Sequence, residues 1–271
     1  MEPDRHLSTS ARTALQILGL YSVESPTLGV SEIGRRMGLP KSNVSRLVAS
    51  LVAEGFLSRT PAGRYRLGLR LHDLASIVSH THELYGPALD ALIELHQATG
   101  ESSHVAVLSG LDVVHLERLL SDYVVRRFTQ DEQFRSPIHA TSTGKVLLAF
   151  GSEALRERAI ARGLPRLTPA TITDPERFRA DLYDIREQGW AVCREEWLPG
   201  ITSVAFPVLD AGRQAVAALA VVGSAHTLTD ARIKSFLPTL RRAAAKVAQD
   251  EAYFNRPAGR LALRNVSAWP S

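Results

Sequence analysis

Five polar side chains stand within six residues of one another, directly after a Gly-Leu-Pro turn. Lysine and arginine bind phosphate oxygens, whereas serine and asparagine are short enough to form hydrogen bonds with base edges. A segment that offers both chemistries predicts contact with double-stranded DNA. The residues of this predicted reading face are Lys41, Ser42, Asn43, Ser45 and Arg46.

Three arginines follow the reading face within a short hairpin. The sequence from Phe56 to Leu67 reads as strand, turn and strand, with Thr-Pro-Ala-Gly at the turn. Arg59, Arg64 and Arg66 would then lie on a wing and contact flanking phosphates, which adds affinity without sequence information. The alternative interpretation is an ordinary helical hairpin with a solvated basic face.

Side chains suited to catalysis or metal binding form no recognisable set. His80 and His82 could share a metal, but no further ligand follows at a familiar spacing, and the CxxC and HExxH patterns are absent. Cys193 lies in an apolar run without an activating partner, and neither GxSxG nor SxxK occurs. The sequence therefore predicts no catalytic residue, no metal and no cofactor.

A loop of small residues could contact a small ligand. Residues 138–145, IHATSTGK, run into a predicted helix, where free backbone amides and the helix dipole favour an anionic or polar group. The alternative is a plain helix start with Lys145 at the surface.

A second loop could close over such a ligand. Residues 195–203 contain a Pro-Gly pair, which lets the backbone turn tightly, and Trp197 and Ile201 could cover a cavity, so that one interpretation of this loop is a lid. Glu195 and Glu196 are adjacent, so in a strand they point to opposite faces and cannot form a catalytic dyad. A solvated loop is predicted for these two carboxylates.

The elements that position the reading face are encoded locally. Apolar residues at helical spacing predict helices over residues 9–21, about 30–37 and 41–54. Gly38 suits a helix C-terminus, and Pro40 has no amide hydrogen to lose where the next helix begins. Together with the hairpin, these helices predict a winged helix-turn-helix unit.

The rest of the chain predicts an α+β domain, because strands precede and follow helices without strict alternation. A linker helix is expected over residues 68–80. Further helices are expected over residues 87–99, 140–150, 155–161, 174–187 and 228–252. Strands are expected over residues 103–108, 113–119, 123–128, 190–194, 203–209 and 215–222, with a hairpin turn at 210–213.

Composition is that of a globular protein with a basic N-terminal part. The 271 residues are 45% hydrophobic and 22% charged, which is enough for two domains. Residues 1–82 hold 10 Lys and Arg against 6 Asp and Glu, and residues 83–271 hold 22 against 22, so the excess of +4 lies beside the reading face. No apolar run or N-terminal leader predicts a membrane association, and the single cysteine fits the cytoplasm.

The order of the motifs resembles that of IclR-type transcriptional regulators. The resemblance covers residues 9–250 and rests on SEIGRRMGLPKSNVSRLVASL, YRLGLRL, HATSTGK, REQGWAV and GITSVAFPV. It implies a winged helix-turn-helix domain (1–67), a linker helix (68–84), a GAF-like α/β effector-binding domain (85–254) and a flexible tail (255–271). It also implies a homodimer or homotetramer that binds a pseudo-palindromic operator.

The same resemblance implies a ligand pocket between the sheet and the helices. Carried over to this sequence, its lining is Ala140, Thr141, Cys193, Ile201, Ser203, Ala220 and Val222. Many relatives have acidic, cysteine or hydroxyl residues at four of these positions, so this pocket is expected to be less polar. Aromatic walls could come from Trp190, Trp197, Phe128 and Phe206, each of which could equally belong to the core.

The prediction is thus a ligand-responsive repressor of a catabolic operon that senses a small aromatic or apolar metabolite. Two alternatives from other classes stay open at this point. One is a small-molecule hydrolase with a DNA-binding appendage, and the other is an architectural DNA protein without a ligand.

Overall fold

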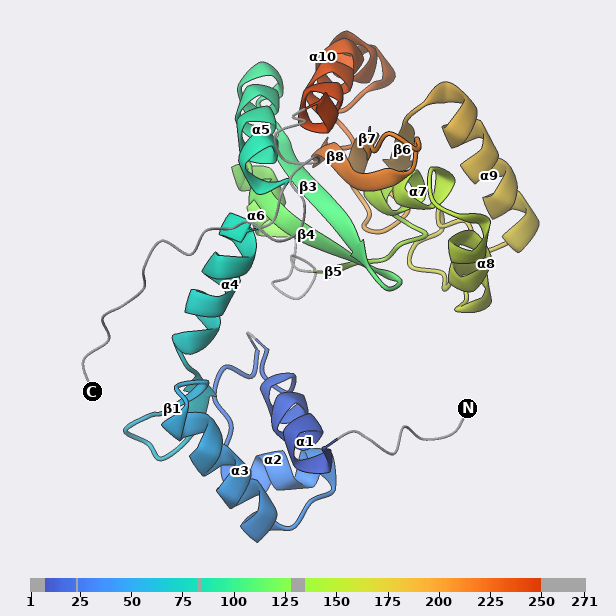
Figure 1. Ribbon diagram of the computed structural model, residues 1–271. Helices are drawn as coiled ribbons and strands as arrows, with labels where there is room; N and C mark the ends of the chain where they lie inside the picture. The colour runs from blue at the N-terminus through green and yellow to red at the C-terminus, as the bar shows by residue number, and fades with distance from the viewer. Residues whose placement is uncertain (1–7, 23, 82–83, 128–134, 250–271) are drawn as a thin grey trace. The chain divides into compact units, whose positions relative to one another are not determined.

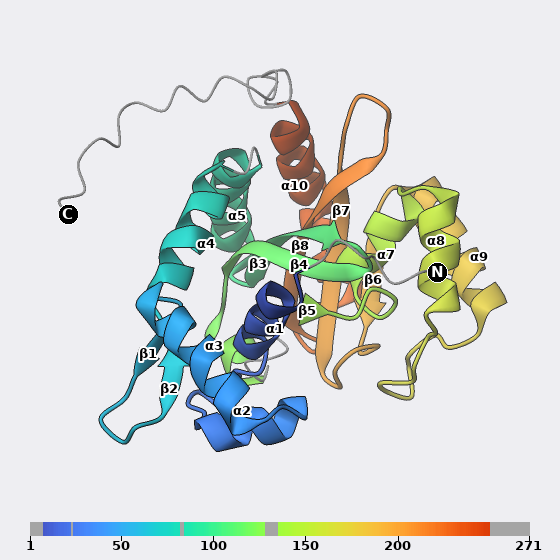
Figure 2. The same ribbon diagram turned by 60° about the horizontal axis from the view of Figure 1, so that its bottom comes forward.

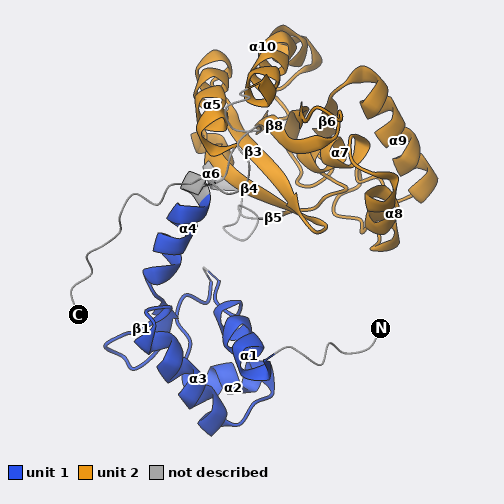
Figure 3. Ribbon diagram, in the orientation of Figure 1, with its two compact units in different colours: residues 1–81 blue, residues 82–271 orange. Residues whose placement is uncertain are grey.

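A computed structural model describes residues 8–22, 24–81, 84–127 and 135–249, in two compact units. The units comprise residues 1–81 and 82–271 (Figure 3). The predicted tail at 255–271 lies outside the described residues. Within the described ranges, no helix combines the length and the apolar character needed to cross a bilayer.

The first unit is a three-helix core with a two-stranded wing (Figure 2). Its elements are α1 (Thr9–Leu18), α2 (Val30–Met37), α3 (Lys41–Ala53), β1 (Leu57–Arg59), β2 (Tyr65–Leu67) and α4 (Arg70–Thr81). The side chains of Ile33, Val44 and Val48 are buried between the helices. Gly38 ends α2 with a left-handed φ of 65°, which glycine adopts without a steric penalty. The predicted turn between α2 and α3 is therefore confirmed.

The second unit is built on one six-stranded sheet in which every pair of neighbours is antiparallel. The strand order is β5-β4-β3-β8-β7-β6. The strands are β3 (Ser102–Ser109), β4 (Asp112–Leu119), β5 (Arg135–Ser136), β6 (Ala191–Arg194), β7 (Ile201–Leu209) and β8 (Ala215–Ser224). The helices are α5 (Tyr85–Thr99), α6 (Asp122–Arg127), α7 (Ser142–Ala149), α8 (Glu153–Ala161), α9 (Pro175–Gln188) and α10 (Asp230–Gln249).

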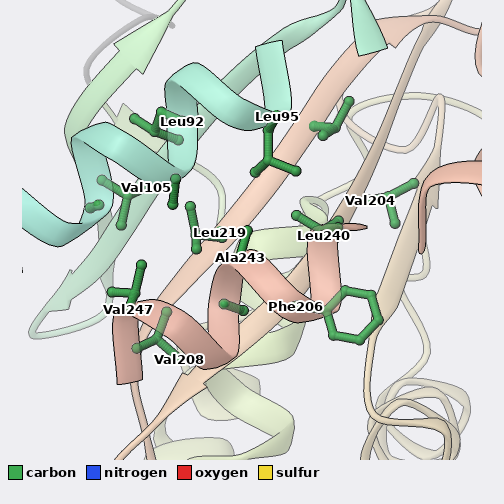
Figure 4. Packing of buried hydrophobic residues seen from close by; sticks show 14 of the residues in the cluster. Leu92, Leu95, Val105, Val204, Phe206, Val208, Leu219, Leu240, Ala243 and Val247 are labelled. Carbon is green, nitrogen blue, oxygen red and sulfur yellow. The ribbon is translucent and has the colours of Figure 1, made fainter. Parts of the chain in front are cut away.

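Helices cover both faces of this sheet (Figure 1). On one face, α5 and α10 bury a core with the strands, in which Leu92, Leu219 and Leu240 are inaccessible to solvent (Figure 4). On the other face, α7, α8 and α9 bury a second core that contains Val146 and Phe178. Full burial of an aliphatic or aromatic side chain stabilises the folded state by about 1.5–3 kcal/mol, so the two cores hold the sheet rigidly between the helix layers.

Strand β4 contains a bulge that changes which side chains face each helix layer. Val105 of β3 is opposite Glu117, but the next residue, Ala106, is opposite His115, so Leu116 is an extra residue. A bulge disturbs the simple alternation of side chains along a strand. His115 and Arg118 consequently lie on the same face, although strict alternation places residues three apart on opposite faces.

The predicted strand over residues 123–128 is wrong, because residues 122–127 form the helix α6. The Tyr-Val-Val run has the β-branched and aromatic residues typical of strands. Among the residues of this run whose burial the structure describes, Val124 is buried against Ile201 and Val222, and Tyr123 is 40% exposed. A short helix is sufficient to bury Val124, and Asp122 in its first turn interacts favourably with the helix dipole.

Candidate functional site

The predicted reading face is exposed along α3. All five of its residues are exposed, while Val44 and Val48 on the opposite side are buried in the core. A guanidinium nitrogen of Arg46 donates a hydrogen bond to Asn43 Oδ1 at 3.0 Å, so these two side chains lie together one turn apart. The helix therefore presents clustered donors and acceptors on a rigid support, as a DNA-reading helix requires.

The three wing arginines are also exposed, but they differ in how they are held. Arg64 donates to the Thr27 carbonyl oxygen at 2.6 Å and to Glu32 Oε2 at 2.8 Å, which ties the wing to the start of α2. Arg66 instead donates to the hydroxyl oxygen of Ser58 on the neighbouring strand, at 3.1 Å. Arg64 thus braces the wing in addition to adding positive charge.

The second unit contains a pocket between the sheet, α6 and the loop that follows β6. About 660 Å³ within it is not filled by protein atoms, including the part open to solvent. Its lining is Ser102, His104, His115, Arg118, Leu120, Val124, Ser136, Ala140, Thr141, Thr143, Cys193, Glu196, Trp197, Leu198, Ile201, Ser203 and Val222. Apolar side chains from α6, β7, β8 and two loops form one continuous wall of it.

One row of neighbouring residues crosses four strands beneath the pocket. Cys193 of β6 is opposite Ser203 of β7, Ser203 is opposite Val222 of β8, and Val222 is opposite Ser102 of β3. All four side chains line the pocket. Antiparallel pairing therefore brings together residues that are up to 120 positions apart along the chain, which sequence order alone does not show.

Six of the seven predicted pocket residues lie in this lining, and Ala220 does not. Ala220 is on the same face of β8 as Val222, but it is fully buried in the core under α7. Thr141 reaches the pocket from the loop before α7, where its hydroxyl group caps the helix by accepting from Gly144 N at 3.2 Å. The assignment of Ala220 to the lining is therefore wrong.

The loop of residues 195–200 lies against the pocket, which is the position that a lid would take, since Trp197 and Leu198 both line it. Two other aromatic candidates, Trp190 and Phe206, do not line the pocket. Trp190 and Phe206 stack on each other on the far side of the sheet, with ring centroids 6.5 Å apart, and Phe128 lies outside the described residues.

Lys145, Glu196 and Asp181 form a charge cluster beside the pocket, in which Lys145 and Glu196 are buried and Asp181 is partly exposed. Lys145 Nζ lies 2.7 Å from Glu196 Oε1 and 2.9 Å from Asp181 Oδ2, and only 1% of the lysine side chain is exposed. Burial by itself would lower the pKa of Lys145, but the surrounding acidic groups outweigh it and raise the pKa. The prediction of a solvated Glu196 is wrong, and so is the alternative of a surface Lys145.

The thiol of Cys193 is buried next to this cluster. Burial raises the pKa of Cys193 well above its usual value, although the positive charge of Lys145 acts in the opposite direction. The thiol is therefore neutral near pH 7 and acts as a small apolar part of the pocket floor, as the sequence predicted.

The end of the pocket formed by β3, β4 and β5 is polar. The rings of His104 and His115 meet edge to face with centroids 4.6 Å apart, and His115 Nε2 lies 2.7 Å from Ser136 Oγ. His104 Nε2 and His115 Nδ1 are buried and have no hydrogen-bond partner within the described residues. No local pattern in the sequence indicates this polar end, because it depends on the bulge at Leu116, which brings Arg118 to the same face as His115.

Two protein-family descriptions match the chain. "IclR helix-turn-helix domain" matches residues 10–61, and "Bacterial transcriptional regulator IclR C-terminal" matches residues 77–249, which is more than half of the chain. The chain belongs to the IclR family. It is a DNA-binding transcriptional regulator that responds to a small molecule, and members of this family are not enzymes.

Relatives of known name match this IclR-family chain over most of its length. The HTH-type transcriptional regulator XynR of Escherichia coli is 31% identical over 90% of this chain and 97% of its own. The probable transcriptional regulator SauR of Cupriavidus necator is 34% identical over 88% and 95%. An IclR homolog from Microbacterium hydrocarbonoxydans, crystallised with 4-hydroxybenzoate, is 31% identical over 89% and 98%, with a TM-score of 0.78.

Metal ligands are not gathered in the described part of this IclR-family chain. No three or more His, Cys, Asp or Glu residues there are placed to hold a metal ion. Of the histidine pair considered from sequence, His82 and the side chain of His80 lie outside the described part.

The buried imidazole of His115 predicts a loss of stability in mild acid. Burial, and then the charge of Arg118, lower the pKa of His115 from 6.5 to about 3. Between these values the unfolded chain binds a proton that the folded chain does not, so stability is full above pH 7 and falls as the pH decreases. From pH 7.5 to 5, His115 should account for a loss of about 2 kcal/mol.

Denaturation followed by the fluorescence of Trp190 and Trp197 measures this loss. His115→Gln, which cannot titrate but can still contact Ser136, should lose less stability than the native chain over the same interval. Equal pH dependence of the two proteins would contradict the role of His115.

Proposed function

We propose that this regulator is a repressor of a catabolic operon and that a small effector with an aromatic or otherwise apolar body releases it from DNA. The observation that carries the proposal is the apolar wall of the pocket, formed by Leu120, Val124, Leu198, Ile201 and Val222. Apolar walls supply most of the affinity of such sites, and a few polar groups set the orientation. The relative that was crystallised with 4-hydroxybenzoate supports an aromatic effector.

The proposed DNA contacts follow from the exposed face of the first unit. Lys41, Ser42, Asn43, Ser45 and Arg46 would enter the major groove, and Arg59 and Arg66 would hold phosphates. Arg64 would act chiefly by fixing the wing, because it is already bound to Thr27 and Glu32.

A homodimer or homotetramer would read a pseudo-palindrome with two such faces. Two large apolar side chains of the first unit, Leu15 and Leu69, are 66% and 83% exposed, which is consistent with pairing of copies through this unit. The effector changes DNA affinity only through its different affinity for the two states of the protein, typically about 1–3 kcal/mol.

Operator binding in the presence of candidate effectors tests the proposal. Duplexes selected from a random pool by the purified protein should be pseudo-palindromic. Aromatic acids, amides and related catabolic intermediates that raise the melting temperature in a concentration-dependent way should weaken binding to the selected duplex about 5- to 150-fold. A stabilising compound that strengthens DNA binding would refute release as the mechanism.

Ser203→Leu is expected to remove the effector response and to leave DNA binding intact. Ser203 lines the pocket, and its hydroxyl oxygen accepts a hydrogen bond from Ser142 at 2.9 Å. Leucine would fill the space above the floor, whereas the control Ser203→Ala removes the hydrogen bond without filling it. In the Ser203→Ala variant, the effector should still weaken binding to the operator. A normal response in the leucine variant would place the effector elsewhere.

A further inference from the structure

The pocket has an acidic end that lacks a hydrogen-bond donor. Glu196 Oε1 accepts from Lys145, but Glu196 Oε2 is buried and has no hydrogen-bond partner within the described residues. A buried acceptor without a donor destabilises the folded state, and the cost is larger when the acceptor is charged. Glu196 lines the pocket, so a ligand that brings an O–H or N–H group to this end would remove that cost.

The opposite end of the pocket is cationic and rich in donors. Arg118 lines it, together with the neutral rings of His104 and His115, of which His104 Nε2 and His115 Nδ1 have no hydrogen-bond partner within the described residues. Each neutral imidazole offers one N–H donor and one acceptor, and arginine binds carboxylates through paired hydrogen bonds. This end therefore matches a carboxylate, whereas the Glu196 end repels one.

The strand order keeps these two ends apart. Arg118 is on β4, and Glu196 is the second residue after the end of β6. Strands β3, β8 and β7 lie between β4 and β6. Four strand spacings place the axes of β4 and β6 roughly 19 Å apart. The side chains of Arg118 and Glu196 span a part of this distance. The apolar wall around Ile201 and Val222 lies between the ends, so one molecule cannot place the same polar group at both.

We propose that the effector is bifunctional: its carboxylate binds Arg118, His104 and His115, a hydroxyl or amino group at its other end donates to Glu196, and an apolar body joins them. This inference rests on the proposed function, because it assigns the polar contacts of the same pocket. It names His104, His115, Arg118 and Glu196 as the residues that determine specificity, in place of the backbone loop before α7.

Isothermal titration with matched benzoates tests the proposal. The probes are the ortho, meta and para hydroxy- and aminobenzoates, benzoate, which lacks the donor, and the hydroxybenzamides, which lack the charge. At least one bifunctional acid should bind with a Kd below about 1 mM and at least about 10-fold more tightly than either of its single-function counterparts, since one charged hydrogen bond is worth about 1.5–3 kcal/mol. The proposal is overturned if no bifunctional acid binds with a Kd below about 1 mM, or if a single-function counterpart binds as tightly as the bifunctional acid.

Two variants test which residue binds each polar group of the effector. Arg118→Gln should remove the preference for the acid over the amide and keep the preference for the hydroxylated probe, and Glu196→Gln should do the reverse. Arg162→Gln removes the same charge on an exposed side chain that pairs with Asp112, and it should change neither preference. Ligand-free melting curves establish that each variant is folded.

The outcomes separate this inference from the proposed function. A neutral or single-function compound that weakens operator binding in the native chain, but not in Ser203→Leu, would leave the repressor and its pocket in place and refute the bifunctional effector. If Arg118→Gln changes the affinities for acid and amide equally, the carboxylate does not bind at the β4 end, and the proposal is likewise refuted.

Discussion

Specific operator binding should fall by at least about 30-fold when Asn43 and Arg46 are both replaced by alanine. The two side chains are exposed on the first turns of α3 and are held together by a 3.0 Å hydrogen bond. A good contact to a base edge contributes about 1–3 kcal/mol of discrimination, and two of them are lost. Electrophoretic mobility shifts with the selected duplex and with an unrelated duplex measure the effect.

Binding to the unrelated duplex should change far less, because it depends on phosphate contacts and the double variant loses one positive charge. Arg158→Ala is the matched control, since it removes an exposed arginine from α8 in the second unit. The effector should stabilise the double variant as much as the native chain. Unchanged operator affinity would show that another surface reads the DNA.

Lys145→Met should destabilise the second unit by about 3–5 kcal/mol. Methionine fills a similar volume, but it leaves the carboxylates of Glu196 and Asp181 close together without a cation, and the Glu196 side chain is only 10% exposed. A loss of this size is a large fraction of the roughly 5–15 kcal/mol that stabilises an ordinary protein. Urea denaturation followed by tryptophan fluorescence measures it.

Asp181→Asn should cost clearly less than Lys145→Met. Its side chain is 31% exposed, so water solvates the charges around it, and the contact between Lys145 and Glu196 persists. A loss below about 1 kcal/mol for Lys145→Met would show that water or protonation compensates the two carboxylates.

The DNA-reading unit could be predicted almost completely from sequence, because its determinants are local. Gly38 ends α2 in the left-handed conformation, and Val44 and Val48 point into the core at helical spacing. The N-cap of α9 could also be predicted from the sequence, since Asp174 accepts a hydrogen bond from Arg177 N and Pro175 follows at the first helical position. Each of these signals involves residues within a few positions of one another.

The pocket was less predictable, because its chemistry depends on contacts distant in sequence. Lys145 and Glu196 are 51 positions apart, and no local pattern shows that one neutralises the other. Residues 122–127 illustrate the converse, since a strong local preference for strand gave way to the packing of Val124 on Ile201. Ala220 was misplaced because α7 covers that part of β8, and the cover is a tertiary feature.

The extra residue at Leu116 has an evolutionary consequence. Residues before and after it in β4 differ by one position in their pairing with β3, so a one-residue insertion or deletion there exchanges which side chains reach the pocket. Effector preference in this lineage can then diverge through strand length as well as through substitution. Pocket residues can be transferred from a relative, position by position, only where both strands share the same bulge.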